Sequence, residues 1–131
     1  MIRIKIVQND ISTVAKVVLI DNKKRVLFLK RSEYVDRFSG EWDLPGGHLK
    51  ANESLIDGLC RETKEETQLD VRAPVFLVKI DNLHFFYAMY DSQNIKLSHE
   101  HTEYAFFEKN QLDPKEKFQK VALDALKKVN I

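Results

Sequence analysis

The sequence predicts an α+β fold, an α/β/α sandwich in which helices cover both faces of a mixed β-sheet. Runs of β-branched and aromatic residues occur both before and after one helix-like segment in the middle of the chain. A second helix-like segment follows near the end, and the runs on each side are joined by connections of hairpin length. The 131 residues are 44% hydrophobic, enough for one core, so residues 1–131 are interpreted as a single domain.

Charge and composition exclude several classes of protein. The 21 basic and 20 acidic residues give a net charge of +1, so no strong field favours nucleic acid or a membrane as an obligatory partner. No apolar run approaches the roughly 18 residues of a membrane span, and the cationic N-terminus has no signal-peptide core. Cys60 is the only cysteine, and its place on the apolar side of a predicted helix favours a buried hydrophobic role over a nucleophilic one. We therefore expect a cytoplasmic protein.

Three strands are predicted before the central helix. In residues 2–6 isoleucine alternates with Arg and Lys, the period-two pattern of a half-buried strand, which we place at a sheet edge. Residues 14–20 and 26–30 are β-rich, and the turn-forming residues 21–24 between them predict a hairpin. The first part of the chain therefore supplies one hairpin and one edge strand.

Cations and glycines follow this hairpin. Arg31 stands at the end of its second strand, and Arg37 lies in the loop predicted for residues 32–41. In the simplest interpretation each is a solvated surface charge. Residues 42–44 form a short extended segment that leads to a turn at Pro45-Gly46-Gly47. A cation that leaves a core strand beside such a turn is well placed to contact a phosphate.

The central helix is predicted over residues 53–67. Asn52 is a suitable N-cap, because its side-chain oxygen can accept a hydrogen bond from a free amide of the first turn. Glu53 then lies in that first turn, where the helix dipole favours an anion. Residues at three- and four-residue steps form one buried stripe, namely Leu55, Ile56, Leu59, Cys60 and Thr63.

Glu62, Glu65 and Glu66 share a face along the border of this stripe. Like charges at this spacing destabilise a helix by roughly 0.2–0.5 kcal/mol per pair, and by more where water is excluded. Arg61 can pair with Glu65 but cannot neutralise the whole group. A hard divalent cation such as Mg²⁺, bound together with substrate phosphates, would do so. The alternative, from these residues alone, is a solvated charged face of the helix.

A second hairpin is predicted after the helix. Its strands are the apolar and aromatic residues 75–80 and 83–90, which flank Asp81-Asn82. Most of the aromatic side chains must enter the core, although one ring could stack on a nucleobase. Residues 91–98 are polar and loop-like, and residues 104–107 predict one more strand.

Two histidines precede that last strand. His99 and His101 flank Glu100, a spacing that occurs in zinc sites. No cysteine or third histidine is suitably placed nearby, so the sequence favours a solvated loop.

The last helix is predicted to begin at Asp113 as N-cap. Pro114 then occupies the first helical position, and Glu116 completes a capping-box arrangement. Its inward stripe is Phe118, Val121, Ala122, Ala125, Leu126 and Val129. We expect this helix to pack on the sheet in a purely structural role.

The charged residues of the central helix and the glycine before it follow a fixed spacing. The pattern resembles the Nudix box, G-x5-E-x7-R-E-U-x-E-E-x-G-U, where U is a bulky aliphatic residue. The matching residues are Gly47, Glu53, Arg61, Glu62, Glu65, Glu66 and Leu69. Thr63 departs from the pattern at an aliphatic position, and Gln68 departs at the late glycine. We expect a packing cost at Thr63 and a cost of roughly 1 kcal/mol at Gln68, where a left-handed C-cap favours Gly.

The resemblance implies a Nudix-like sandwich with a central catalytic helix and a C-terminal helix. It also implies hydrolysis of a nucleoside diphosphate linked to another moiety, with Mg²⁺ as the cofactor and Mn²⁺ as a substitute. Glu62 and Glu66 would be the principal metal ligands, and Glu65 would be a further ligand or hold a metal-bound water. Arg61 would orient the carboxylates through its planar fork.

The residues outside these four receive their roles by position in the same family. Gly46 would offer a backbone oxygen to the metal, and Gly46 and Gly47 would contact substrate with Arg31 and Arg37. Glu53 would complete the acidic cluster or act on it from outside the ligand shell. Glu100 would be the further acid that Nudix enzymes supply from an opposite loop, with Glu103 as the alternative.

The rival hypothesis is a module of the same fold that binds a nucleotide or an RNA end without cutting it. Every acid of the box is present, which favours the enzyme. The substrate itself stays open between nucleoside triphosphates, dinucleoside polyphosphates, nucleotide sugars, ADP-ribose and capped RNA. The small chain favours small soluble nucleotides, no membrane partner is expected, nucleic acid is not required, and the oligomeric state is not predicted.

Overall fold

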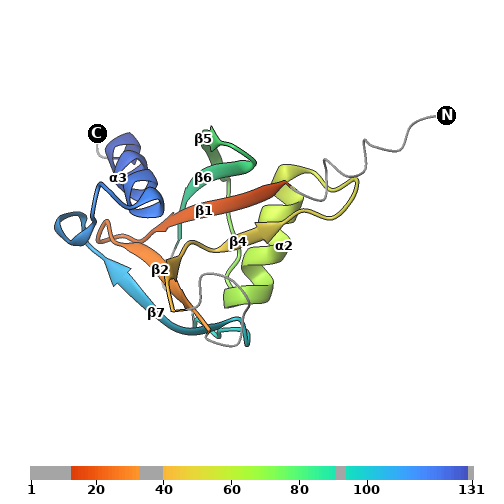
Figure 1. The fold of residues 1–131 in the computed structure, drawn as a ribbon, viewed down its shortest axis with the longest axis horizontal. Helices are drawn as coiled ribbons and strands as arrows, with labels where there is room; N and C mark the ends of the chain where they lie inside the picture. The colour runs from red at the N-terminus through yellow and green to blue at the C-terminus, as the bar shows by residue number, and fades with distance from the viewer. Residues whose placement is uncertain (1–12, 33–39, 91–93, 130–131) are drawn as a thin grey trace.

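The computed structural model describes residues 13–32, 40–90 and 94–129. The strand predicted for residues 2–6 and the cation Arg37 lie outside the described residues. Within them, the helices α2 (Leu55–Thr67) and α3 (Lys117–Val129) lie on opposite sides of a β-sheet, and a short 3-10 helix, η1 (Lys109–Gln111), precedes α3 (Figure 1). The predicted α/β/α arrangement is confirmed.

Seven strands of the described residues form one mixed sheet. Their main order is β3-β2-β1-β6-β5, with β4 paired to β1 and β7 paired to β2. The pairing of β1 with β6 is parallel, whereas the other pairings are antiparallel. The strands are β1 (Val14–Ile20), β2 (Val26–Arg31), β3 (Trp42–Asp43), β4 (Gly46–His48), β5 (Val75–Ile80), β6 (Leu83–Met89) and β7 (His101–Phe107).

Strand β1 is the centre of the core because it is buried along its whole length. Side chains of successive residues point to opposite faces of a sheet. Val18 and Ile20 therefore pack with α3 in one cluster, and Val17 and Leu19 pack with α2 in the other. Burial on both faces explains why this strand is a nearly continuous apolar run rather than an alternating one.

The β1–β2 hairpin opens immediately beyond its turn. Its strands pair at Ile20 and Val26 and then diverge, so that β4 pairs with the start of β1 and β3 pairs with the end of β2. The predicted Pro-Gly-Gly turn is wrong at this point, because Gly46 and Gly47 belong to strand β4 and the chain bends at Pro45. A Cβ on Gly46 would lie 2.1 Å from the Ala15 carbonyl oxygen, so this close pairing requires glycine.

Helix α2 begins at Leu55, two residues later than predicted. Ser54, not Asn52, is the N-cap, and its hydroxyl accepts a hydrogen bond from the Asp57 amide at 3.1 Å. Asn52 instead has a left-handed φ of 67° in the preceding turn, and Glu53 lies before the helix rather than in its first turn. Ile56, predicted as part of the buried stripe, is 40% exposed.

The end of α2 agrees with the prediction. Gln68 is the C-cap with a left-handed φ of 69°, and its amide donates to the Lys64 carbonyl at 2.9 Å. The conformation that favours glycine is therefore adopted by glutamine. Thr63 is fully buried, and its hydroxyl has no hydrogen-bond partner among the described residues, which is the expected cost of a polar group at an aliphatic position.

Helix α3 begins four residues after the predicted cap. Glu116 stands before the first helical residue, and its carboxylate accepts from the Gln119 amide at 3.0 Å, the hydrogen bond expected of an N-cap. Asp113 accepts from the Lys115 amide in the turn before the helix. The inward stripe is confirmed, since Val121, Ala122, Ala125 and Leu126 are buried, with Phe118 and Val129 packed against them.

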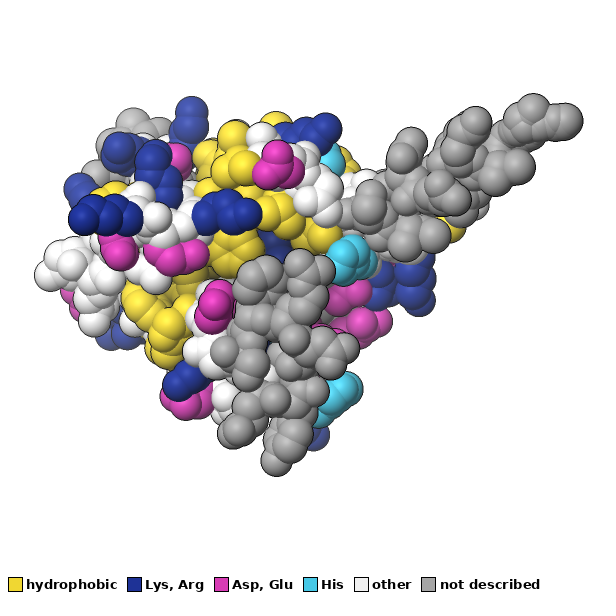
Figure 2. Space-filling view, in the orientation of Figure 1, with side chains coloured by type: hydrophobic (Ala, Val, Ile, Leu, Met, Phe, Trp, Pro, Cys, Tyr) yellow, Lys and Arg dark blue, Asp and Glu magenta, His cyan; other side chains and the backbone are white. Residues whose placement is uncertain are grey.

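Two further features of the described part of the chain concern the surface. On the face shown in Figure 2, Lys and Arg side chains gather over α3. No helix among the described residues is both long enough and apolar enough to cross a membrane.

Candidate active site

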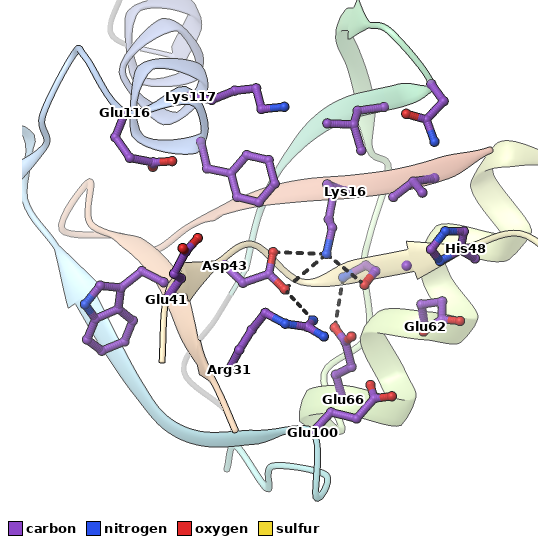
Figure 3. Close-up of a pocket in the computed structure, with 17 residues that line it drawn as sticks. Lys16, Arg31, Glu41, Asp43, His48, Glu62, Glu66, Glu100, Glu116 and Lys117 are labelled. Carbon is purple, nitrogen blue, oxygen red and sulfur yellow. Dashed lines mark hydrogen bonds and ion pairs between the residues drawn. The ribbon is translucent and has the colours of Figure 1, made fainter. Parts of the chain in front are cut away.

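A cleft with a volume of about 590 Å³ lies where β1 and β2 diverge, and residues of β1, β2, β3 and β4 form one of its walls. The other walls come from α2, the turn before β7 and the start of α3 (Figure 3). The predicted site residues that line it are Arg31, Gly46, Gly47, Glu62, Glu66 and Glu100, and its other charged lining residues are Lys16, Glu41, Asp43, Glu116 and Lys117, with His48 beside them. The cleft therefore brings together most of the predicted site, and α3 contributes to it as well as to the core.

Glu66 lies at the base of this cleft. Its side chain is on the inner side of α2, the residue is only 5% exposed, and one carboxylate oxygen accepts from the Gly46 amide at 2.9 Å. Burial raises the pKa of Glu66 to about 8, although the Lys16 ammonium and the Gly46 hydrogen bond oppose the shift. The Lys16 charge and the Gly46 hydrogen bond therefore do not fully offset the cost of burying the ionised carboxylate of Glu66.

Glu62 lies one turn earlier on α2 and is half-buried. Its carboxylate accepts from Arg61 Nη1 at 3.1 Å. Burial raises the pKa of Glu62, and the neighbouring guanidinium of Arg61 partly offsets the effect. Gly47 leaves room for this side chain, because a Cβ there would lie 2.6 Å from Glu62 Oε1.

Glu65 is placed differently from the other two acids. Its side chain is 57% exposed and pairs with Arg61 Nη1 at 3.3 Å. It is not among the residues that line the cleft. The face predicted to hold three carboxylates therefore directs two of them, Glu62 and Glu66, into the cleft.

Arg61 connects the helix to the segment before it. Its Nε and Nη2 atoms donate to the two oxygens of Glu53, at 2.8 and 3.0 Å, and Nη2 also donates to the His48 carbonyl at 3.1 Å. The hydrogen bonds from Arg61 and from the Lys50 amide hold the pKa of Glu53 at about 2. Glu53 thus fixes Arg61, and Arg61 in turn fixes Glu62.

Glu100 reaches the same cleft beside Glu66, from a different segment of the chain (Figure 3). It lies in the turn that precedes β7, and this turn is attached to the end of α2 because the Ser98 amide donates to the Glu66 carbonyl at 3.1 Å. Glu103, the alternative acid, is the third residue of β7 rather than its first, and it pairs with Lys30 at 3.6 Å with its side chain 60% exposed. Glu103 does not line the cleft.

Three buried polar residues at this site were missed by the sequence prediction. Lys16 donates to both oxygens of Asp43, at 3.0 and 3.2 Å, and His101 Nε2 lies 3.4 Å from Asp43 Oδ2. Burial alone would raise the pKa of Asp43, but the Lys16 charge and the hydrogen bonds from His101 and Lys16 hold it at about 2. The solvated loop predicted around His101 is wrong, since His101 is 3% exposed.

One sequence signal could have pointed to the buried group formed by Lys16, Asp43 and His101, namely a lysine within an apolar strand. Lys16 is the one charged residue in the run Val14–Ile20. A lone lysine inside a buried strand requires a partner, yet the partner could not be identified before β3 and β4 were placed beside β1. Phe118 was missed as well, since it was predicted only as part of the core and it lines the cleft, whereas no aromatic residue of β6 does.

Comparison with known proteins identifies the family. The family model described as NUDIX domain matches residues 11–128, which is most of the chain. The chain belongs to the Nudix family. The described geometry agrees with this assignment, because three residues of the Nudix box, Gly47, Glu62 and Glu66, line the cleft from β4 and α2.

Individual relatives share a modest fraction of identical residues with this chain or match only a short part of it. A MutT protein from Methanosarcina mazei Go1 has 26% identity, a TM-score of 0.65, and coverage of 90% of this chain and 94% of that one. An ADP-ribose pyrophosphatase from Streptococcus suis has 18% identity, a TM-score of 0.70, and coverage of 91% and 92%, which shows the shared fold. The m7GpppN-mRNA hydrolase NUDT17 of Xenopus laevis is 41% identical over 46 residues, which are 35% of this chain and 16% of that protein.

The Nudix site also has the chemistry of a magnesium site. Among the described residues no three His, Cys, Asp or Glu side chains could hold a metal ion by themselves. Mg²⁺, however, is commonly bound by one or two carboxylates, with waters and substrate phosphates completing its shell. Glu62, Glu66 and the Gly46 carbonyl would offer hard oxygen ligands, and the burial of Glu66, which Lys16 only partly offsets, favours an added cation. The donor set therefore fits the ion.

Proposed function

We propose that this Nudix protein is a Mg²⁺-dependent pyrophosphohydrolase that cleaves the pyrophosphate bond of a nucleoside diphosphate linked to another moiety. The observation that carries the proposal is the convergence of Glu62, Glu66 and Glu100 on one cleft, two from the Nudix helix and one from the turn before β7. Acids brought together from two segments of the chain can act on one bound group. Mn²⁺ is expected to replace Mg²⁺.

Charge balance explains the need for the cation. A pyrophosphate in the cleft would add its negative charge to those of Glu62, Glu66 and Glu100, and Lys16 is already paired with Asp43. Mg²⁺, when bound, offsets this charge, polarises the P–O bonds and lowers the pKa of a water. Glu62, Glu66 and the Gly46 carbonyl are the groups that would hold it, and Glu65 at the helix surface would act through water.

The remaining residues orient the substrate and the nucleophile. Arg31, with its Nη1 atom 3.4 Å from Asp43 Oδ2, and Lys117 at the start of α3 line the cleft and offer positive charge to phosphate oxygens. Gly47 allows close approach of substrate to the backbone. Glu100 would accept the proton of the attacking water as general base. Arg61, fixed by Glu53, keeps Glu62 in place.

Cleft size and the relatives support a small nucleotide substrate. Pockets for small molecules have volumes of roughly 300–1,000 Å³, and the cleft has about 590 Å³. One similar structure is an ADP-ribose pyrophosphatase, and the Xenopus relative of the matched segment is an m7GpppN-mRNA hydrolase. Both names describe nucleoside diphosphates joined to a further group, so small soluble compounds of this class are the favoured substrates and capped RNA is the next to test.

A product-resolved screen tests the proposal. Wild-type protein is incubated with nucleoside triphosphates, dinucleoside polyphosphates, nucleotide sugars, ADP-ribose and capped RNA, with Mg²⁺ or with excess chelator, and products are separated by chromatography. We expect a nucleoside monophosphate product from at least one substrate, only with the metal. Glu66→Gln should lower kcat by roughly a hundredfold or more, since the amide retains the helix but not the charge.

A surface acid provides the matched control. Asp70→Asn removes an exposed carboxylate that pairs with Lys64 at 3.1 Å just after α2, and it should retain wild-type turnover. Near-normal turnover by Glu66→Gln, or by wild type in chelator, would contradict the proposal. Saturable binding of a substrate without any product would instead support the non-catalytic binding module.

A further inference from the structure

We propose that Asp43 is a positioning residue of the Nudix site, which holds the Gly46 carbonyl through Lys16 and the turn that carries Glu100 through His101. The inference rests on the proposed function, because Gly46 and Glu100 matter for rate only if the cleft is catalytic. Asp43 itself would not react. Its role would be to keep groups from three separate strands in one geometry.

The first half of this connection runs from Asp43 to the Gly46 peptide. Lys16 Nζ contacts both Asp43 oxygens and also donates to the Gly46 carbonyl oxygen at 3.3 Å (Figure 3). It donates to the Leu44 carbonyl oxygen as well, at 3.1 Å. The Gly46 amide donates to Glu66 at the same time. The backbone of Gly46 is therefore held at its carbonyl oxygen by Lys16, which Asp43 fixes, and at its amide by Glu66.

The second half runs from Asp43 to the turn before β7. His101 directly follows Glu100, and its Nε2 atom lies 3.4 Å from Asp43 Oδ2 in a buried position. An ionised carboxylate can only accept, so the hydrogen bond requires the proton on Nε2. His101 Nδ1 is buried with no partner among the described residues, so the contact with Asp43 is what anchors this ring.

Two backbone hydrogen bonds also hold the turn that carries Glu100. The Ser32 amide donates to the Glu100 carbonyl at 2.7 Å, and the Ser98 amide donates to the Glu66 carbonyl. The turn is thus attached to β2 on one side and to α2 on the other. The side chain of His101 adds a third attachment, to β3, at the residue next to the proposed base.

Asp21 shows what a purely local role looks like. It is also buried, and it accepts from Arg25 Nε at 2.8 Å and from the amides of Lys23 and Arg25. All of these partners lie in its own hairpin turn. The side chains that contact Asp43 come from β1, β2 and β7, so its loss should disturb the relative placement of strands rather than one turn.

The first test compares Asp43→Asn with Asp21→Asn as a matched control. We expect kcat of Asp43→Asn to fall roughly tenfold to a hundredfold with little change in KM, the size of effect that small misplacements of reacting groups give. Asp21→Asn should keep kcat even if it melts earlier. Hydrogen exchange supplies a readout independent of turnover. The amides of Gly46 and Ser98 should exchange roughly tenfold faster in Asp43→Asn, and not in Asp21→Asn.

Coupling to Glu100 distinguishes positioning from general destabilisation. Glu100→Gln should lower kcat less in the Asp43→Asn background than in wild type, because the base would already be misplaced. Fully multiplicative effects, or the same kcat and exchange rates in the two Asn variants, would overturn the proposal. If wild type turns over no substrate, the exchange comparison still decides whether Asp43 orders Gly46 and the turn.

A pair of His101 variants decides the question if Asp43→Asn does not fold. His101→Gln can still donate to Asp43, whereas His101→Leu cannot, and both leave the pair between Lys16 and Asp43 in place. We expect kcat within about threefold of wild type for the Gln variant and a decrease of roughly tenfold for the Leu variant. Equal turnover and equal Ser98 exchange in the two variants would contradict the role of this contact.

Discussion

Arg61 and Glu53 are joined by two hydrogen bonds, from Nε to Oε2 at 2.8 Å and from Nη2 to Oε1 at 3.0 Å. The pair spans eight residues and closes the segment between β4 and α2 against the helix. The planar fork of arginine matches a carboxylate in this way, and a lysine ammonium cannot reproduce it. We therefore expect Glu53 to support the acidic cluster rather than to bind the metal.

Arg61→Lys should lower kcat by roughly tenfold or more, because Glu62 loses its fixed partner. Glu53→Gln should have a smaller effect on kcat, since the amide oxygen can still accept one hydrogen bond from Arg61. Steady-state kinetics of both single variants and of the double variant check this prediction. The double variant should be no slower than Arg61→Lys alone, and additive losses would show that Glu53 acts by another route.

Glu66 should make the metal-free protein less stable as the pH rises. Its pKa is about 8 in the folded protein against 4.5 for the ordinary carboxyl, so the folded state holds a proton that the unfolded state has lost. This contribution to stability is complete below pH 4.5 and disappears as the pH rises through about 8. Glu66→Gln should lack this loss and should melt no lower than wild type in chelator at pH 8.

Denaturant unfolding at pH 5 and pH 8, with and without Mg²⁺, measures the effect. Added Mg²⁺ should raise the wild-type midpoint at pH 8 more than that of the variant, since the ion binds the folded protein. A strongly destabilised metal-free Glu66→Gln would show instead that the carboxylate is a structural ion-pair member.

Glu100 and Glu103 should differ sharply in their effect on rate. Glu100→Gln should lower kcat by roughly tenfold to a thousandfold with a small change in melting temperature, as the loss of a general base would. Glu103→Gln should stay close to wild type, because its exposed side chain pairs with Lys30 outside the cleft. The reverse order in steady-state kinetics would move the role to Glu103, and two silent variants would leave Glu62 as the next candidate.

Gly47→Ala should act on Glu62 specifically. The new methyl group would lie 2.6 Å from Glu62 Oε1, so the carboxylate must move out of its position on the cleft wall. We expect kcat to fall roughly tenfold or more while the protein still folds. Asp70→Asn is the control, since its exposed carboxylate pairs with Lys64 outside the cleft, and it should leave kcat nearly unchanged.

Elements with strong local signals were predicted well from the sequence. The strands around residues 21–24 and 81–82 have the expected hairpin turns, and Gln68 has the expected left-handed conformation. Glu62 and Glu66 are one helical turn apart on the face that lines the cleft, as the helical period predicts, although the same period did not separate them from the exposed Glu65. These results depend only on residues near one another in the chain.

The misses depend on contacts between distant segments or on closely matched local alternatives. Asn52 and Ser54 have similar N-cap preferences, and the backbone conformation of the preceding turn decides for Ser54. Gly46 has the composition of a turn but pairs with Lys16 in a neighbouring strand. Lys16 finds its partner Asp43 across 27 residues, a distance at which sequence pattern gives no register.

The last turn of α2 has a consequence for exchanging loops between relatives. Its carbonyl oxygens at Glu66 and Thr67 accept from the amides of Ser98 and Lys96, at 3.1 and 3.0 Å. A loop grafted here must therefore supply two donating amides at this spacing, and a proline at either position would remove one of them. Chimaeras that keep these two amides can vary the side chains of the loop between β6 and β7 while leaving Glu100, at the end of that loop, attached to the helix.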